Sequence, residues 1–292
     1  MDAGNKQGGI VTVWQMPHPP VVVPEVGHGR EAEIEETLAS MRAAAGSIAQ
    51  CNADTLIVIS PHATMSPERI IINADSPLRG DLGQFGARAA ALEFAGDSGL
   101  AGQIAEEASA AGIAVTVDAG LRNQGGGRYF APQNKKLDHG SVVPLYFVDK
   151  AIKTHNAVRP KLIIISIAYM DNSTLYRFGG RIAQAVNKSG GTAALITSGD
   201  LSHKLTVDGP YGFDPAGPEF DRHILDCIAA RDAQKLIDTD ETLLERAAQC
   251  GFYGLLMAYG ALDEIDGARA AVAGILSYEG TFGVGYAIAR LL

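Results

Sequence analysis

Three histidines in this chain each follow, within a few residues, an apolar segment that ends at a small-residue turn. They are His18, His62 and His203, and the preceding segments span residues 10–16, 54–60 and 192–198. In open α/β sheets, ligands bind in the crevice outside the carboxyl ends of the strands. If these segments are neighbouring parallel strands, the three imidazoles meet at one edge of the sheet. Neutral imidazole is the commonest metal-binding side chain, so the pattern favours a metal centre.

His18 and His62 are the strongest candidates for metal ligands. His18 stands in the run Pro17-His18-Pro19-Pro20, where the prolines partly fix the backbone and suit a side chain that must point one way. Two histidines and a carboxylate, with open coordination positions, are typical of non-haem Fe(II) oxygen chemistry. A second interpretation stays open, in which the two imidazoles only cap strand ends through hydrogen bonds.

Two further histidines could take part in catalysis. His203 lies three residues after Asp200, and a carboxylate that orients an imidazole can make it a general base near neutral pH. Alternatively, Asp200 and Ser202 cap the following segment, and His203 faces solvent. His139 lies in a predicted turn, Asp138-His139-Gly140, and allows the same two interpretations.

Two other side chains could complete a metal site. Cys250 precedes Gly251 at a predicted helix break, where it is either a small buried apolar residue or a soft metal ligand. Glu279 lies at the tip of a predicted strand and could be a ligand, a group that orients a ligand, or part of a turn. Spacing alone does not decide among these roles.

The pattern of apolar segments predicts an α/β fold. Continuous apolar runs over residues 54–60 and 161–168 are typical of buried parallel strands, and residues 31–49 and 173–188 show helical spacing. Strands that alternate with helices imply βαβ units. We therefore predict one domain over residues 1–292, with a central, mostly parallel or mixed sheet flanked by helices and the active site at the carboxyl ends of the strands.

Two glycine-rich segments interrupt this pattern. Residues 76–97 are predicted to form an excursion from the sheet or a lid, and residues 120–136 to form a polar loop. The loop at residues 125–128 and the Gly/Pro loop around Tyr211 are both placed to cover a pocket.

Composition excludes several classes of protein. The chain has 292 residues, of which 47% are hydrophobic and 20% charged, with a net charge of -9. Nucleic acid is an unexpected partner, because phosphate binding needs a basic surface. No apolar run is long enough to span a membrane, and the first residues lack the layout of a signal peptide. Three widely spaced cysteines fit a reducing compartment, so we expect a cytoplasmic protein.

The order and spacing of these motifs resemble those of the B-subunit-like class III extradiol ring-cleavage dioxygenases, a superfamily that includes the Memo-like proteins. The resemblance covers nearly the whole chain and is greatest with the Memo-like branch. The segments that carry it are residues 16–27, 60–62, 137–145, 198–203, 249–251, 260–263 and 277–286.

The resemblance implies a role for each histidine. His18 and His62 fall at the two metal-binding histidines of the family, and His203 falls at its catalytic base. His139 falls at a histidine that lines the substrate or oxygen pocket. The mechanism implied is removal of a phenolic proton by His203 and its later return as the ring opens.

The third metal ligand departs from the usual pattern. The family usually has a glutamate where this chain reads Gln249-Cys250-Gly251. Memo-like proteins without that glutamate offer a cysteine, which maps to Cys250. A neutral Gln249 brings no charge to offset a cation, and Glu279 is a further alternative. A site of two histidines and one cysteine suits softer metals as well as iron.

The resemblance implies an Fe(II)-dependent dioxygenase that acts with O2 on a catechol or aminophenol. The alternative is a Memo-like protein that binds iron or copper, or another divalent metal, without ring cleavage. A third reading is an α/β domain that has lost its metal and binds a small molecule or a protein. A homodimer and a small partner-domain protein are the expected macromolecular partners.

Overall fold

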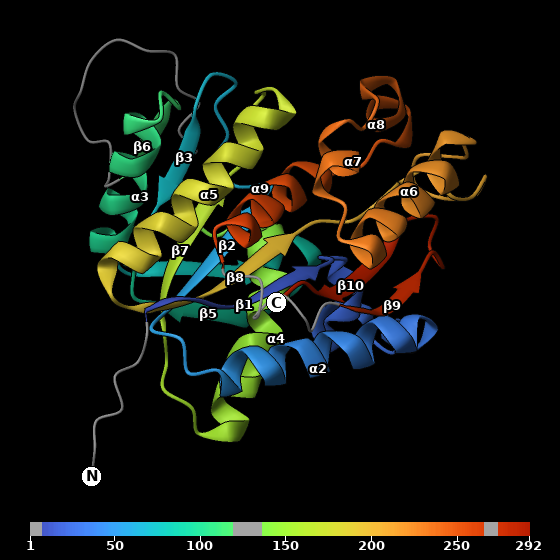
Figure 1. Cartoon of the computed structure of the whole chain (residues 1–292). Coiled ribbons are helices and arrows are strands. Elements are labelled where there is room, and N and C mark those ends of the chain that lie inside the picture. Colours follow the sequence, from blue (N-terminus) through green and yellow to red (C-terminus); the bar gives the residue numbers. More distant parts are fainter. Residues whose placement is uncertain (1–7, 119–135, 266–273) are drawn as a thin grey trace.

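The fold is organised around an eight-stranded mixed sheet (Figure 1), as the computed structural model of residues 8–118, 136–265 and 274–292 describes it. The strands follow the spatial order β6-β3-β7-β2-β8-β1-β10-β9. Their bounds are β1 (Gly9–Met16), β2 (Thr55–Ser60), β3 (Ile70–Asn73), β6 (Val115–Asp118), β7 (Lys161–Ser166), β8 (Thr192–Ser198), β9 (Gly274–Glu279) and β10 (Tyr286–Arg290).

The centre of the sheet is parallel. Strands β7, β2, β8 and β1 are neighbours and run in the same direction, so their carboxyl ends lie at one edge. Every residue of β2 and β8 is buried, as expected for parallel strands covered by helices on both faces. Antiparallel pairs, β3 with β7 on one side and β1 with β10 on the other, make the sheet mixed. The predicted α/β class is confirmed, whereas the single-domain boundary at residues 1–292 stays a prediction.

Helices cover both faces of the sheet (Figure 1). Helices α2 (Glu35–Gln50) and α4 (His139–His155) pack on one face, and α3 (Ser98–Ala110), α5 (Asn172–Ser189) and α9 (Phe252–Asp263) pack on the other. Further helices are α6 (Ala216–Ala230), α7 (Ala233–Ile237) and α8 (Glu241–Ala247). A separate apolar core forms on each face, and each fully buried large side chain contributes roughly 1.5–3 kcal/mol.

The predicted turn at His139 is wrong, because His139 is the first residue of the long helix α4. Helix α4 is buried on nearly all sides, so its sequence lacks the alternation of apolar and polar faces that would reveal it. It also contains Pro144, a residue that is disfavoured inside helices. Asp138 caps the helix by accepting a hydrogen bond from the Ser141 backbone N–H at 3.0 Å.

The excursion predicted at residues 76–97 is a β-hairpin. Strands β4 (Leu78–Leu82) and β5 (Ala87–Phe94) pair with each other in a small sheet of their own and pack against α4. The 3-10 turn between them, η3 (Gly83–Phe85), carries an exposed phenylalanine at its end. The polar loop predicted at residues 120–136 lies, except for its last residue, outside the described residues. No helix in the described part of the chain is long and apolar enough to span a bilayer.

Candidate metal centre

Three adjacent parallel strands each deliver one polar side chain at the same distance past their ends. His18 follows the end of β1 by two residues, and His62 follows the end of β2 by two residues. The equivalent residue after β8, which pairs between these two strands, is Asp200. The three side chains therefore gather at one level above the carboxyl edge of the sheet.

The ring nitrogens of His18 and His62 face each other. The two Nε2 atoms lie 3.1 Å apart, and the Cys250 Sγ atom lies 3.6 Å from the Nε2 atom of His18. One donor atom from each of the three residues lies within 4.8 Å of the other two. A second such group, Asp200, His203 and Cys250, shares the cysteine with the first. This spacing allows the donors to surround one metal ion.

A chain of hydrogen bonds fixes the tautomer of His18. Pro144 has no N–H, so the carbonyl of Gly140, one helical turn earlier, has no helical donor. That carbonyl accepts the hydroxyl proton of Ser198 at 2.5 Å. The Ser198 Oγ atom lies 2.9 Å from the Nδ1 atom of His18 and, with its own proton committed, accepts a hydrogen bond from it. The Nε2 atom of His18 is then unprotonated and free to bind a metal.

His203 presents its own Nε2 atom in a similar way. Its Nδ1 atom contacts the carbonyl of Ala248, so that nitrogen carries the proton and donates it. The Nε2 atom faces the Oδ2 atom of Asp200 at a distance of 3.9 Å. The ring of Tyr211 lies against the imidazole at a centroid distance of 5.2 Å. The His203 side chain is mostly buried, so the solvent-facing alternative does not describe it.

Asp200 connects the histidines to the cysteine. Its Oδ1 atom accepts a hydrogen bond from the His18 backbone N–H at 2.8 Å, and its own N–H points to the Cys250 Sγ atom at 3.3 Å. The backbones are close here because both contacting residues are glycines. A Cβ atom on Gly199 would lie 2.1 Å from the Cα atom of Gly251. Larger residues would push Cys250 away from the strand ends.

Burial keeps the centre free of positive charge. It lowers the pKa of His18 well below its usual value, assisted by the neighbouring His62, whose own pKa is also lowered by burial. Burial raises the pKa of the Asp200 carboxyl, and burial together with Asp200 raises the pKa of the Cys250 thiol. In the described part of the chain, the ion-pair partners of Asp200 are histidines, not lysine or arginine. A divalent cation would supply the missing positive charge and hold the acidic groups ionised.

His139 forms one wall of the centre. Its ring stacks on His62 at a centroid distance of 4.3 Å and an interplanar angle of 26°, and it meets His18 edge-on at 5.4 Å. Phe85, from the β4–β5 hairpin, contacts the ring from another side at 5.5 Å. Burial lowers the pKa of His139, and the proximity of His62 lowers it further. The imidazole is therefore neutral and can donate one hydrogen bond.

The remaining candidate ligands are used elsewhere. The Gln249 Oε1 atom accepts a hydrogen bond from the Phe252 backbone N–H at 2.9 Å and caps helix α9. The Glu279 Oε2 atom accepts two hydrogen bonds from Thr37, from its backbone N–H at 2.6 Å and its hydroxyl at 2.5 Å. Both side chains stabilise helix starts, whereas Cys250 approaches the ring nitrogens.

A cleft opens beside the centre. It has a volume of about 530 Å³, and Asp200 forms part of its wall. Residues 19–21, 206–210 and 281–286 contribute most of the remaining lining, together with Arg30. Its size is in the range of small-molecule pockets, about 300–1,000 Å³. A ligand in this cleft would reach the donors of the centre from the Asp200 side.

Comparison with protein families matches most of the chain to one family. Residues 12–289 match the family described as the catalytic LigB subunit of aromatic ring-opening dioxygenase. The chain belongs to this family. Members of the family bind a metal ion and act on aromatic substrates with O2, and the donors of this centre all lie within the matched residues.

Similar proteins extend the comparison without naming an activity. The chain is 35% identical over 279 residues to Protein CA_C1420 of Clostridium acetobutylicum, which covers 95% of this chain and 56% of that protein. The chain thus spans about half the length of this relative. The crystal structure of the uncharacterized protein JW3007 from Escherichia coli K12 superposes with a TM-score of 0.59. It covers 97% of this chain and 100% of its own at 13% identity, which shows a common fold.

Proposed function

We propose that this protein is a non-haem Fe(II)-dependent extradiol dioxygenase that opens the ring of a catechol or an aminophenol. One observation carries the proposal: the Nε2 atoms of His18 and His62 lie 3.1 Å apart beside a buried carboxylate, Asp200, that lines a cleft. A third histidine, His203, turns its Nε2 atom toward the same carboxylate. Membership of the ring-opening dioxygenase family supports the reaction class.

The donors suit a ferrous ion. His18 and His62 would bind it through their Nε2 atoms, and Asp200 or Cys250 would take the third position. Two histidines and one carboxylate, with open positions, are typical of Fe(II) oxygenases. The bound ion supplies the redox chemistry with O2 and makes the substrate hydroxyl more acidic.

His203 is the proposed general base. Its Nε2 atom accepts the phenolic proton of the substrate, while its Nδ1–H remains hydrogen-bonded to the Ala248 carbonyl and keeps the ring in place. The nearby Asp200 carboxylate then stabilises the protonated imidazole, 3.9 Å away in the free protein. The same ring returns the proton after the ring opens, so the base is regenerated.

Aromatic walls would hold the substrate. His139 donates a hydrogen bond to the substrate or to oxygen, and its own position is fixed by stacking on His62. Phe85 and Tyr211 contact the rings of His139 and His203, so they border the centre on both sides. Flat faces of this kind favour a planar ring over an aliphatic diol.

Oxygen uptake tests the proposal directly. The protein is purified without oxygen, loaded with Fe(II) and mixed with a panel of catechols and aminophenols. We expect stoichiometric iron, uptake of one O2 per ring opened and the yellow absorbance of the ring-opened product. Stoichiometric iron with no uptake across the panel contradicts the proposal.

A second candidate function rests on Cys250. Its sulfur lies 3.6 Å from the Nε2 atom of His18, and a site with a thiolate ligand also suits copper and other soft metals. In that case the protein is a Memo-like metal-binding protein without ring cleavage. The two functions make opposite predictions for the third ligand.

The third ligand is tested with Asp200→Asn and Cys250→Ser. If the dioxygenase proposal holds, Asp200→Asn weakens Fe(II) binding by more than tenfold, because it removes the charge that offsets the cation, and Cys250→Ser has the smaller effect. Equilibrium titration of both variants with Fe(II) and Cu(I) gives the affinities. A larger loss for Cys250→Ser, with copper bound more tightly than iron, supports the metal-binding function instead.

A further inference from the structure

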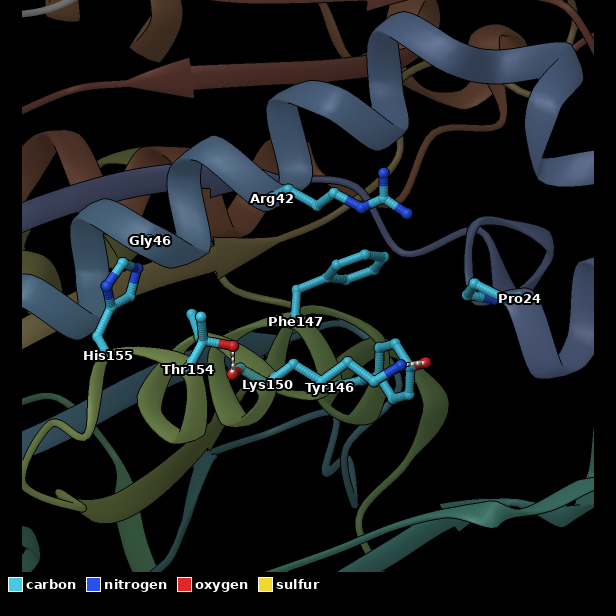
Figure 2. A pocket seen from close by; sticks show the side chains of 9 residues that line it. Pro24, Arg42, Gly46, Tyr146, Phe147, Lys150, Thr154 and His155 are labelled. Atoms are coloured by element: carbon cyan, nitrogen blue, oxygen red, sulfur yellow. Dashed lines mark hydrogen bonds between the residues drawn. The ribbon is translucent and has the colours of Figure 1, made fainter.

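A second cavity lies between helices α2 and α4, on the face of the sheet opposite to α5. Figure 2 shows α2 with Arg42 on one wall and α4 with Tyr146, Lys150 and Thr154 on the other. The cavity has a volume of about 260 Å³ and shares no lining residue with the cleft beside the metal centre. Its described lining consists of Pro24, two residues of α2 and six residues of α4.

The lining is basic although the chain as a whole carries a net charge of -9. None of these lining residues is acidic, whereas two are permanently cationic at neutral pH. The local charge of this cavity is therefore positive, whereas the net charge of the whole protein is negative, so the cavity favours an anion. The nonpolar part of the lining, Phe147 with Pro24 and Ala151, gives the same cavity an apolar surface.

The two cations differ in their partners. The Lys150 ammonium donates to the Tyr146 hydroxyl and lies 3.6 Å from the Glu25 carboxylate, while Tyr146 itself donates to Glu25 at 2.5 Å. Lys150 is thus largely neutralised at that end of the cavity. Across the described residues, Arg42 has no carboxylate within ion-pair distance, so its guanidinium has five donors to offer a ligand.

Gly46 keeps the cavity open. It lies one turn after Arg42 in the middle of α2, with Gln50 one turn further along the same stripe. A Cβ atom there would meet only the His155 Nε2 atom, at 3.8 Å, so packing does not require a glycine. Alanine would stabilise this helix position by up to about 1 kcal/mol. The missing side chain leaves a space in front of the His155 imidazole, within the same cavity.

We propose that the α2/α4 cavity binds a small aromatic anion, a phosphate or a carboxylate attached to a single ring. The charged group lies against the Arg42 guanidinium, and the ring lies on Phe147 and extends toward the space at Gly46. The volume fits one ring and its anionic group, and it is too small for a peptide or a nucleic acid. This site is separate from the metal centre and does not depend on the function proposed for it.

Phenyl phosphate is the probe for this site. Its binding to the full, metal-free chain is measured by calorimetry at low ionic strength, alongside inorganic phosphate. We expect saturable binding of phenyl phosphate at one site, and weaker binding of inorganic phosphate because it lacks the ring. Equal affinities for the two would overturn the aromatic part of the proposal, and absence of binding would overturn all of it.

Matched variants locate the bound anion. Arg42→Gln should weaken binding by about tenfold or more, because a charge-assisted hydrogen bond is lost. Gly46→Leu should abolish it by filling the cavity, while circular dichroism and thermal unfolding show an intact fold. Arg222→Gln is the control, since Arg222 is another exposed helical arginine, in α6. Unchanged binding in Arg42→Gln and Gly46→Leu, or loss of binding in His62→Ala, would place the anion elsewhere and overturn the proposal.

Discussion

The metal centre and the α2/α4 cavity both contain histidine, but the electrostatic surroundings of the histidines are opposite. At the strand ends, His18 is buried and surrounded by other histidines, so its imidazole is neutral and offers a lone pair. On the helix surface, His155 is exposed and lines the same cavity as Arg42 and Lys150, a setting that attracts anions. The difference teaches that burial and the neighbouring charges together decide whether a histidine takes part in a cation site or an anion site.

The largest expected effect is the loss of metal from the strand-end cluster. His18→Ala or His62→Ala removes one of two facing nitrogen donors, so each should abolish stoichiometric metal binding. His155→Ala is the matched control, because it removes an imidazole from the other region. Elemental analysis of the three purified variants measures the effect. Full metal content in His62→Ala would break the comparison, since the cluster would then not be a cation site.

The next effect separates binding from proton transfer within the metal centre. His203→Ala should keep the metal and lower turnover by about 10²–10⁴, the usual contribution of a general base. Oxygen-uptake rates at saturating substrate and iron content are measured on the same sample. His223→Ala, which removes a histidine that bonds Thr239 in another part of the fold, is the control. Wild-type turnover by His203→Ala would refute its role as base.

A smaller effect concerns a second buried carboxyl group, Asp221, whose hydrogen-bond partners are uncharged. Asp221 accepts hydrogen bonds from the Ser202 backbone N–H at 2.7 Å and from the Tyr278 hydroxyl at 2.6 Å. Burial raises the pKa of its carboxyl to about 7. Between pH ~4 and pH 7, the native state holds a proton that the unfolded state has released. The contribution of Asp221 to stability is therefore present below pH ~4 and is lost as the pH rises through 7.

Urea unfolding of the wild type and Asp221→Asn at pH 5, 6, 7 and 8 measures this contribution. The stability advantage of the wild type over the variant should shrink between pH 5 and 7 by up to about 1.4 kcal/mol per pH unit, and then level off. Asp226→Asn, an exposed residue of the same helix, should show no such trend. A difference that stays constant from pH 5 to pH 8 would mean that Asp221 is already ionised in the native state.

The smallest effect concerns the alternative ligand. Gln249→Glu restores the carboxylate that the ring-opening dioxygenases usually have, yet the side chain at this position caps α9. We expect the carboxylate to keep the cap, with a gain in stability of up to about 1 kcal/mol and unchanged affinity for Fe(II). Thermal unfolding and an Fe(II) titration check both quantities. Tighter Fe(II) binding would show that the side chain leaves the helix and reaches the centre.

Much of the fold and part of the site followed from the sequence. Continuous apolar runs predicted the central parallel strands, and the strand-end rule predicted that His18 and His62 would meet. The same rule, applied by counting two residues past each strand, would also have found Asp200, which the structure places level with them. The sequence pattern favours His203 because it is a histidine, although it lies three residues beyond Asp200.

Other features depend on contacts that no local pattern contains. Helix α4 has no polar face to reveal its period, and its internal Pro144 argues against a helix. Cys250 was assigned by resemblance, because its approach to His18 depends on the contact between two glycine backbones. The hydrogen bonds that occupy Gln249 and Glu279 depend on where α9 and α2 start.

The contact between Gly199 and Gly251 also makes the assembly of the metal centre depend on complete folding of the chain. Cys250 and His18 are 232 residues apart in the chain, and they meet where the start of α9 packs against the end of β8. Contacts between residues so distant in the sequence are slow to form because closing the loop between them costs entropy. A partly synthesised or misfolded chain cannot offer all the donors together, so a cation captured by them stabilises the native state alone. The metal content of a preparation would then count the molecules that have completed folding.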